Sequence, residues 1–363
     1  MEKFKENLEE YLAPFWKAKR IVNETVMFVG KDDVAQLTYR PEEVISVKDY
    51  RSEKIYLPGK DYLVEGKRIR RADGSAIPFW EEEEYYTPNF DVYRIAAKKQ
   101  ICDKMGGQRF LKYGEGDTFT SKQIALTYRT KEEWEGEIPQ GKAHKFRNTV
   151  FSLKNKKDMK FLFYGDSITT GCDASGTNMG GNIPPYMPAF DRMICEYLTG
   201  KYGSGIQRIN TAEGGMNTRW GVDHFDERVL AYDPDCLFIA FGMNDPTTPF
   251  GEYRTMVKEM IERMHAHNAR TEIMLISPML PNDEADENWY ANQIYFYREL
   301  LGLEKDYDYV ATADVTSMHR KLLSAGKRYR DMTANNINHP NDFLIRLYAQ
   351  VILTTLLGED FDL

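Results

Sequence analysis

The chain has 363 residues, more than a single hydrophobic core usually fills, so we expect two domains. Its 48 Lys and Arg residues stand against 56 Asp and Glu residues, which gives a formal net charge of −8. This balance provides no broad basic surface and argues against nucleic acid as a partner. No stretch approaches the roughly 18 consecutive apolar residues of a membrane span, so we expect no membrane partner either.

The four cysteines are far apart and form neither CxxC pairs nor a dense disulfide framework. Residues 1–20 mix charged and apolar residues at helical spacing, without the uninterrupted apolar core of a signal peptide. We interpret this segment as a short amphipathic helix. These features favour a cytoplasmic location, although a chain trimmed of a leader would look the same. The sequence leaves the oligomeric state open.

Residues 22–150 contain short segments in which apolar and polar residues alternate, as they do in half-buried strands. These segments are TVMFVG, VAQLTYR, EVISVKDY, DYLVEGKRIRR, VYRIAAKK, FTSKQIALTYR and NTVFSL. Glu65 and Gly66 interrupt the fourth segment where a hairpin would turn, since glycine tolerates positive φ. We predict an antiparallel, jelly-roll-like β-sandwich domain over residues 1–155, which includes the short N-terminal helix.

After the polar stretch KNKKD at residues 154–158, apolar strands alternate with helical segments. The strands are KFLFYG, QRINTA, CLFIAFG, EIMLISPM and YVATADV, and DFLIRLYAQVILTTLLG forms the last helix. Strands separated by helices of this length are typical of a parallel sheet covered on both faces. We therefore assign residues 156–363 to an α/β domain with a doubly wound parallel sheet.

Polar residues follow these strands, at the edge of the sheet where ligands bind in doubly wound folds. Ser167, Gly215 and Asn244 follow the first three strands, and His339 precedes the final helix. A serine nucleophile needs a base, for which His339 is the candidate. The anion formed from an ester carbonyl needs fixed donors, and the backbone N–H groups of Ser167 and Gly215 and the amide of Asn244 are candidates.

Taken singly, these signals are weak, because Gly-Asp-Ser triplets and Asn-Asp pairs are common in turns. As an ordered set they are specific: YGDSIT, AEGGMNT, GMND and NHPND make residues 158–357 resemble the SGNH, or GDSL-type, hydrolase superfamily. The resemblance implies a flavodoxin-like sheet, Ser167 as nucleophile, His339 as general base, and Gly215 and Asn244 in the oxyanion hole. Members of the superfamily are esterases, lipases, thioesterases and carbohydrate deacetylases.

One position departs from the family pattern. The family usually has an aspartate three residues before the histidine, where this chain has Asn336, whose amide supplies no negative charge to the imidazole. Three outcomes are open: a Ser-His dyad steadied by Asn336 or a backbone carbonyl, an acid from elsewhere, or lost catalysis. Candidate acids are Asp331, Asp245 and Asp342. We favour the dyad and expect Asn336→Asp to do no great harm.

A β domain before an SGNH domain that lacks the triad acid also resembles the two-domain carbohydrate esterases of family 2. These remove acetyl groups from plant polysaccharides or their oligosaccharides. Candidate substrate-binding residues are Asp166, Trp220, Tyr186 and Trp289. The aromatic ones are candidates because ring faces stack on sugars, although packing residues at helix starts would look alike.

We therefore expect a bacterial serine esterase, a carboxylic ester hydrolase that removes O-acetyl groups from xylan- or mannan-type oligosaccharides through an acyl-enzyme. We expect no cofactor and no metal, and an acetylated carbohydrate as the partner. Two alternatives stay open. One is a lipase or thioesterase, and the other is a non-catalytic carbohydrate-binding protein in which the hydrolase domain is a relic.

Overall fold

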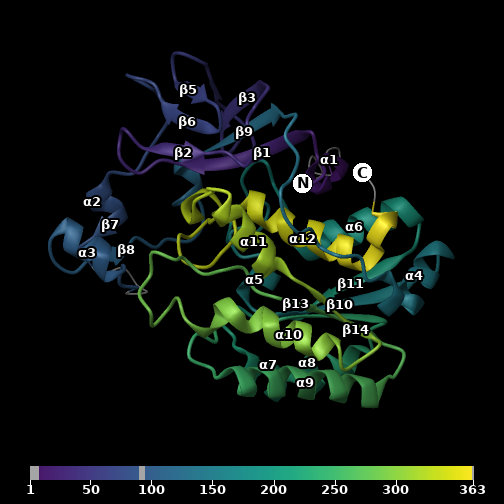
Figure 1. Cartoon of the computed structure of the whole chain (residues 1–363). Coiled ribbons are helices and arrows are strands. Elements are labelled where there is room, and N and C mark those ends of the chain that lie inside the picture. Colours follow the sequence, from purple (N-terminus) through teal and green to yellow (C-terminus); the bar gives the residue numbers. More distant parts are fainter. Residues whose placement is uncertain (1–7, 90–94, 362–363) are drawn as a thin grey trace.

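The computed structural model describes residues 8–89 and 95–361 (Figure 1). Antiparallel sheets occupy the N-terminal region, and one five-stranded parallel sheet flanked by helices forms the C-terminal region. The predicted fold class is confirmed, with an α/β domain preceded by antiparallel β structure.

The described part of the N-terminal region is built on three small sheets. The largest is antiparallel, in the order β1 (Arg20–Met27), β9 (Gln123–Arg129), β3 (Glu43–Asp49) and β4 (Ile55–Tyr56). The second has the order β2 (Val34–Gln36), β6 (Arg68–Arg71) and β5 (Tyr62–Glu65), and the third pairs β7 (Tyr86–Thr87) with β8 (Phe110–Leu111). The helices of this region are α1 (Leu8–Leu12), α2 (Glu82–Tyr85), α3 (Lys99–Met105) and the short η2 (Thr120–Lys122) and η3 (Ala143–Lys145).

The predicted hairpin at Gly66 is present, because β5 pairs with β6 and Gly66 has φ +62°. The strand expected at NTVFSL is wrong: these residues belong to helix α4 (Arg147–Lys154). Thr149 and Leu153 are buried there while Phe151 is 56% exposed, a four-residue spacing that a strand cannot produce. Residues 1–7 of the expected N-terminal helix, and part of VYRIAAKK, lie outside the described residues.

The parallel sheet has the order β11 (Ile206–Asn210), β10 (Met159–Gly165), β12 (Cys236–Ala240), β13 (Glu272–Ile276) and β14 (Val310–Ala313). Its second strand in sequence lies outside the first, which is the flavodoxin-like order. Successive side chains point to opposite faces: Phe161 and Phe163 join one hydrophobic cluster, and Leu162 and Tyr164 join another. Both faces of the sheet are therefore buried under helices.

One face of the sheet is covered by α6 (Phe190–Tyr202) and α12 (Asp342–Leu357), and the other by α7 (Thr218–Asp223), α9 (Phe250–His267) and α10 (Phe296–Glu304). The remaining helices of the described chain are α5 (Ser167–Thr170), α8 (Phe225–Arg228), α11 (Val315–Ser324), η4 (Leu230–Tyr232), η5 (Asn292–Tyr295), η6 (Tyr329–Asp331) and η7 (Gly358–Asp360). None of the described helices combines the length and the apolar character that crossing a bilayer requires.

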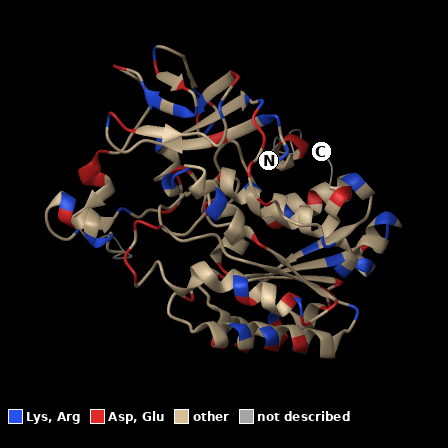
Figure 2. Cartoon of the chain, in the orientation of Figure 1, with Lys and Arg blue, Asp and Glu red and all other residues tan. Residues whose placement is uncertain are grey.

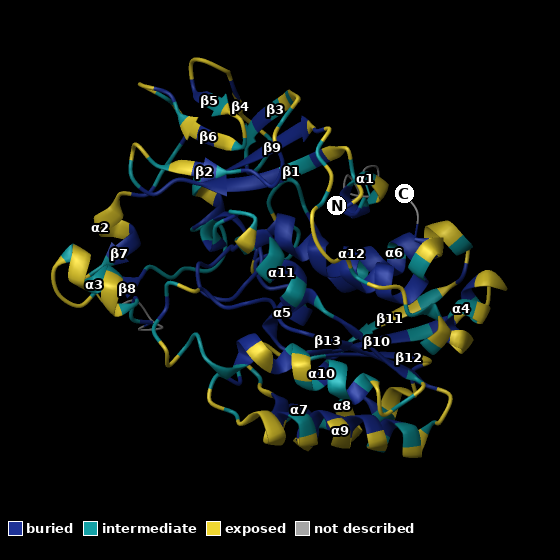
Figure 3. Ribbon diagram, in the orientation of Figure 1, coloured by how far each residue is buried: buried dark blue, intermediate teal, exposed yellow. Residues whose placement is uncertain are grey.

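Helix α12 lies between the parallel sheet and the N-terminal region, and all of its residues are buried (Figure 3). A helix that is apolar nearly all round needs partners on every side. One hydrophobic cluster runs through α12 and includes both Val26 of β1 and Phe163 of β10. Arg346 adds polar contacts, since its guanidinium donates to the carbonyls of Val22 and Asn23 at 2.9 and 3.0 Å. The two regions thus share one core.

Lys and Arg residues and Asp and Glu residues are interspersed along the ribbon in the view of Figure 2. An ion pair inside the molecule is different: Lys327 Nζ lies 2.9 Å from Glu24 Oε1, and both side chains are fully buried. Lys327 also donates to the carbonyl of Thr25 at 2.7 Å. This pair joins β1 to the segment after α11, which leads to His339.

Candidate functional site

Ser167 is the first residue of α5, directly after strand β10. Asp166 caps this helix, because its side chain accepts a hydrogen bond from the Ile168 N–H at 3.0 Å. Gly165 lets the strand end approach β12, since a Cβ at this position would lie 2.4 Å from the Ala240 carbonyl oxygen. The Ser167 N–H lies in the first turn of a helix, where N–H groups have no intrahelical acceptor. The serine is therefore presented at the carboxyl edge of the sheet.

His339 lies in a tight loop just before α12. Asn335 shapes this loop, since its side-chain oxygen accepts from the N–H groups of Ile337, Asn338 and His339, each at 3.0 Å. The loop is closed by the Ala334 N–H, which donates to the His339 carbonyl at 3.0 Å. The imidazole itself is buried, and its Nε2 lies 2.9 Å from Ser167 Oγ. The structure thus brings the predicted nucleophile and base together.

Two carboxylates face the other nitrogen of the imidazole. Asp173 Oδ2 lies 2.7 Å from His339 Nδ1, and Glu115 Oε2 lies 3.1 Å from the same atom. Because both partners are acceptors, Nδ1 carries the proton of the neutral imidazole, and Nε2 of that form can accept a proton from Ser167. Asp173 comes from the loop after α5, whereas Glu115 comes from the N-terminal region.

The carboxylates change the basicity of the imidazole. Burial lowers the pKa of His339, but its hydrogen bonds to Asp173 and Glu115 outweigh burial and raise the pKa to about 9. Burial raises the pKa of Asp173, whose side chain has no exposed surface. Burial acts to raise the pKa of Glu115, but its hydrogen bonds to His339, Asp173 and Asn335 together outweigh burial and lower the pKa, in keeping with a side chain that is 31% exposed. Imidazolium formed during a reaction would therefore lie beside negative charge.

The candidate oxyanion donors lie on the same side of the sheet as Ser167. A Cβ built on Gly214 would be 3.9 Å from Ser167 Cβ, which places the turn with Gly215 against the serine. Gly215 has φ +78°, a conformation that favours glycine. Asn244 reaches the same turn, because its side-chain amide donates to the Met216 carbonyl at 3.0 Å. All four SGNH positions thus meet at one place, and their individual roles stay predictions.

The candidate acids taken from the sequence are wrong. Asn336 points away from the imidazole and accepts a hydrogen bond from the Tyr85 hydroxyl at 2.7 Å. Asp331 accepts from the Met27 N–H and pairs with Arg328. Asp245 holds the start of α7 through Thr218, and Asp342 accepts from the N–H and hydroxyl of Ser175. The favoured Ser-His dyad steadied by Asn336 is therefore corrected, because acids from elsewhere face the histidine.

The candidate substrate-binding residues have varied surroundings. Asp166 is 2% exposed and caps α5, and its contact with substrate stays a prediction. Trp220 is half-buried on α7 and stacks on His224 with 4.5 Å between ring centroids. Trp289 packs on the aromatic cluster of the N-terminal region. Tyr186 is half-buried in the loop after α5, with φ +60°. Substrate contact by the three aromatic residues stays a prediction.

Sequence reasoning missed three residues around the histidine: Asp173, Glu115 and Asn335. Asp173 stands six residues after Ser167, and its nearness to the nucleophile in the chain was a usable signal. Asn335 directly precedes Asn336, the position at which the family usually has its aspartate. Glu115 lies more than two hundred residues from His339, and its only local signal is the glycine on each side of it.

The ligand atoms of Glu115, Asp173 and His339 lie within 4.8 Å of one another, a spacing that a metal site also shows. In a tetrahedral zinc site with bonds near 2.0–2.1 Å, a nitrogen and an oxygen ligand are about 3.3 Å apart. The 2.7 Å between His339 Nδ1 and Asp173 Oδ2 is instead the length of a direct hydrogen bond. The cluster is therefore better described as hydrogen-bonded side chains than as a metal centre.

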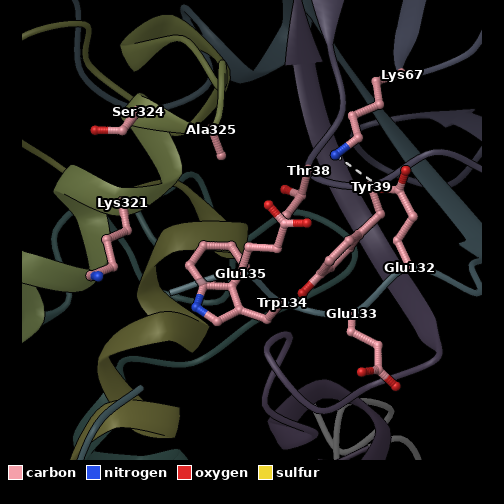
Figure 4. A pocket seen from close by; sticks show the side chains of 10 residues that line it. All are labelled: Thr38, Tyr39, Lys67, Glu132, Glu133, Trp134, Glu135, Lys321, Ser324 and Ala325. Carbon is pink, nitrogen blue, oxygen red and sulfur yellow. Dashed lines mark ion pairs between the residues drawn. The ribbon is translucent and has the colours of Figure 1, made fainter. Parts of the chain in front are cut away.

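A large cavity of about 850 Å³ lies elsewhere, between the N-terminal region and α11 (Figure 4). It is lined by Trp134, Tyr39 and several charged side chains, among which Lys67 and Glu132 form an ion pair at 2.9 Å. None of its lining residues belongs to the Ser167 site. The arrangement of Ser167, His339 and the two carboxylates, rather than cavity size, identifies the candidate active site.

Comparison with known proteins agrees with this geometry. Residues 163–343 match the model of the GDSL-like lipase/acylhydrolase family, a range that includes Ser167, Gly215, Asn244 and His339. This part of the chain belongs to the GDSL-like lipase/acylhydrolase family. A search of curated proteins found no match.

One solved esterase structure shares the fold of this part of the chain. A two-domain esterase (CEX) active on acetylated mannans, co-crystallized with mannopentaose, aligns with a TM-score of 0.50 and 18% identity, over 62% of this chain and 55% of that chain. The alignment thus spans little more than half of that esterase. Axe2, an acetylxylan esterase from Geobacillus stearothermophilus, aligns with a TM-score of 0.46 and 20% identity, over 56% of this chain and 96% of that chain.

Proposed function

We propose that the protein is a serine esterase that removes O-acetyl groups from carbohydrates of the xylan or mannan type. The observation that carries the proposal is the continuous line of contacts from Ser167 Oγ through His339 to the buried carboxylate of Asp173, at 2.9 and 2.7 Å. These distances are within the hydrogen-bond reach that a nucleophile, its base and an orienting acid require, which supports the proposal.

In the proposed reaction, Ser167 Oγ attacks the acetyl carbonyl while its proton moves to His339 Nε2. The negative charge that forms on the carbonyl oxygen is stabilised by the N–H groups of Ser167 and Gly215 and by the amide of Asn244. The carbon–oxygen bond to the sugar then breaks, and the sugar oxygen takes the proton from His339. Water repeats the sequence on the acetyl-enzyme and releases acetate, which restores Ser167.

The surroundings of the serine favour a small polar substrate. The loop after α5, residues 171–189, is rich in Gly, Asn, Thr and Pro. A long acyl chain would need an extended apolar trough beside the serine. The net charge of −8 suits a neutral sugar better than an anionic one. The esterases named above are described as acting on acetylated mannans and as an acetylxylan esterase, which agrees with this substrate class.

The proposal is tested by measuring hydrolysis of 4-nitrophenyl acetate, then of longer acyl esters, and finally of acetylated xylan and mannan oligomers with free acetate as the readout. Ser167→Ala should lower kcat by about 10⁴-fold or more, because the nucleophile is lost. Ser121→Ala removes an exposed hydroxyl that donates to the Thr118 carbonyl and not to Ser167 or His339, and it should leave activity unchanged.

The outcomes separate the candidate functions. A steep fall of kcat/KM with acyl length supports deacetylation, and a preference for long chains would favour a lipase instead. Full activity of Ser167→Ala would refute the assignment of the nucleophile. No turnover of any ester, together with retained binding of xylan or mannan oligomers, would favour a carbohydrate-binding protein.

A further inference from the structure

A short turn of the N-terminal region reaches into the candidate active site. We name it the GEG turn, after its residues Gly114, Glu115 and Gly116, and it lies between β8 and η2. Two of its groups touch the residues around the imidazole. Glu115 Oε2 lies 3.1 Å from His339 Nδ1, and the Gly116 N–H donates to Asp173 Oδ1 at 2.8 Å. The turn thus contacts both members of the histidine–aspartate pair.

The geometry favours glycine at both ends of this turn. A Cβ on Gly114 would lie 2.6 Å from the side chain of Thr118, closer than real atoms approach. Gly116 has φ +73°, which side chains disfavour, and lies beside the Met179 carbonyl in the loop after α5. The backbone conformation of the GEG turn is therefore constrained, and this conformation directs the carboxylate of Glu115 toward the imidazole.

We propose that the GEG turn is a positioning device for catalysis, in which Glu115 is a second acceptor for the Nδ1–H of His339 and Gly116 orients Asp173. This inference rests on the proposed function. It goes beyond that function because it makes the N-terminal region part of the machinery that activates the serine.

The chemistry follows from the two acceptors. When Ser167 Oγ bonds to the acyl carbon, its proton moves to His339 Nε2 and the imidazole becomes positively charged. The Nδ1–H then lies between Asp173 Oδ2 and Glu115 Oε2, and it stays on nitrogen while both oxygens stabilise the charge. The proton on Nε2 later passes to the leaving oxygen. Because two carboxylates share one N–H, removal of either leaves the other in place.

Other titratable groups face this cluster and bear on its pH dependence. The Tyr113 hydroxyl donates a hydrogen bond to the Glu115 carboxylate. Burial raises the pKa of Cys172 to about 12 and that of Asp166 to about 7. Of these groups, Asp166 titrates closest to neutral pH, and it makes no contact with Glu115 among the hydrogen bonds of the described chain. A change of Glu115 therefore acts on the histidine and also on Asp173, whose pKa the neighbouring Glu115 raises in addition to burial.

The experiment measures kcat and kcat/KM for 4-nitrophenyl acetate between about pH 6 and about pH 10. Glu115→Gln should lower kcat by about 10-fold, the value of one charge-assisted hydrogen bond. Asp173→Asn should lose about 10²- to 10³-fold, and the double variant the full loss of about 10⁴-fold seen when a triad acid is neutralised. The single variants should thus fall short of the double one.

The pH profile supplies a readout that mere structural support would not move. Catalysis needs neutral imidazole, and loss of a neighbouring negative charge makes imidazolium less stable, so the acidic limb of Glu115→Gln should shift to lower pH. Asp117→Asn is the matched control, because Asp117 is in the same segment but is half exposed and pairs with Arg51 at 2.5 Å. It should retain the profile of the unaltered enzyme.

Failure of the inference and failure of the proposed function give different results. If Ser167→Ala is inactive while Glu115→Gln keeps the rate and the acidic limb of the unaltered enzyme, the role of the GEG turn is overturned and the esterase is not. If Ser167→Ala keeps full activity, the proposed nucleophile itself falls. Should Asp173→Asn fail to fold, the partly exposed Glu115→Gln still decides the question.

Discussion

The two halves of the candidate active site are held in different ways. The serine side, residues 159–173, is local: β10 ends, Asp166 caps α5, and Ser167 begins it. The histidine side, residues 327–341, is held by strands β1 and β9 of the N-terminal region. Gln123 of β9 donates to the carbonyl of Thr333 at 2.7 Å, and Thr25 of β1 to that of Asp331 at 2.6 Å.

This difference gives the N-terminal region a part in the active site. Contacts within a few residues form as the local segment folds, whereas contacts three hundred residues apart exist only once both regions have packed. The shared core around α12 and the buried pair Lys327–Glu24 fix the histidine loop against β1. The pair of Ser167 and His339 therefore depends on contacts from both regions of the chain.

The largest expected effect comes from removing the histidine itself. His339→Ala should lower kcat for 4-nitrophenyl acetate by about 10⁴-fold or more, because Ser167 loses its base. His267→Ala, a change at a 41% exposed histidine on α9, is the control and should keep the activity of the unaltered protein. If His339→Ala were as active as the unaltered protein, another group would have to activate the serine.

A second change tests the long-range support of the histidine side. Lys327→Met removes a buried ammonium and leaves Glu24 as an uncompensated buried charge. The free energy of unfolding, measured by urea denaturation, should fall by about 3–5 kcal/mol. The exposed pair Lys258–Glu262 on α9 provides the comparison, since Lys258→Met should change stability by less than about 0.5 kcal/mol. Equal effects of the two variants would contradict the importance of the buried contact.

A smaller effect is expected at Asn336, and it revises the expectation drawn from the sequence. The amide nitrogen of Asn336 donates to the Lys112 carbonyl at 3.0 Å, so Asn336→Asp would set a carboxylate oxygen against a carbonyl oxygen. We expect a loss of about 1–3 kcal/mol of stability in thermal denaturation. No gain in activity should follow, because this side chain does not contact His339. An unchanged stability with faster hydrolysis would favour the family's usual acid position instead.

Much of the parallel sheet could be predicted, because each strand and helix is encoded by residues close together in the sequence. Apolar strands, helical periods and polar residues at strand ends located Ser167, Gly215, Asn244 and His339. The acids were not found because their signal is spatial: Asp173 meets the histidine only when the loop after α5 folds back, and Glu115 only when the N-terminal region docks. NTVFSL was misread for a similar reason, since its burial against the sheet domain decides between strand and helix.

The central claim is that Ser167 is a nucleophile activated by His339, and covalent labelling tests it most directly. A fluorophosphonate reacts with an activated serine, and mass spectrometry of the intact protein and its peptides locates the adduct. The account predicts a single adduct on Ser167, absent in Ser167→Ala and formed far more slowly in His339→Ala. Labelling of a different serine, or equal labelling of Ser167 without the histidine, would contradict it.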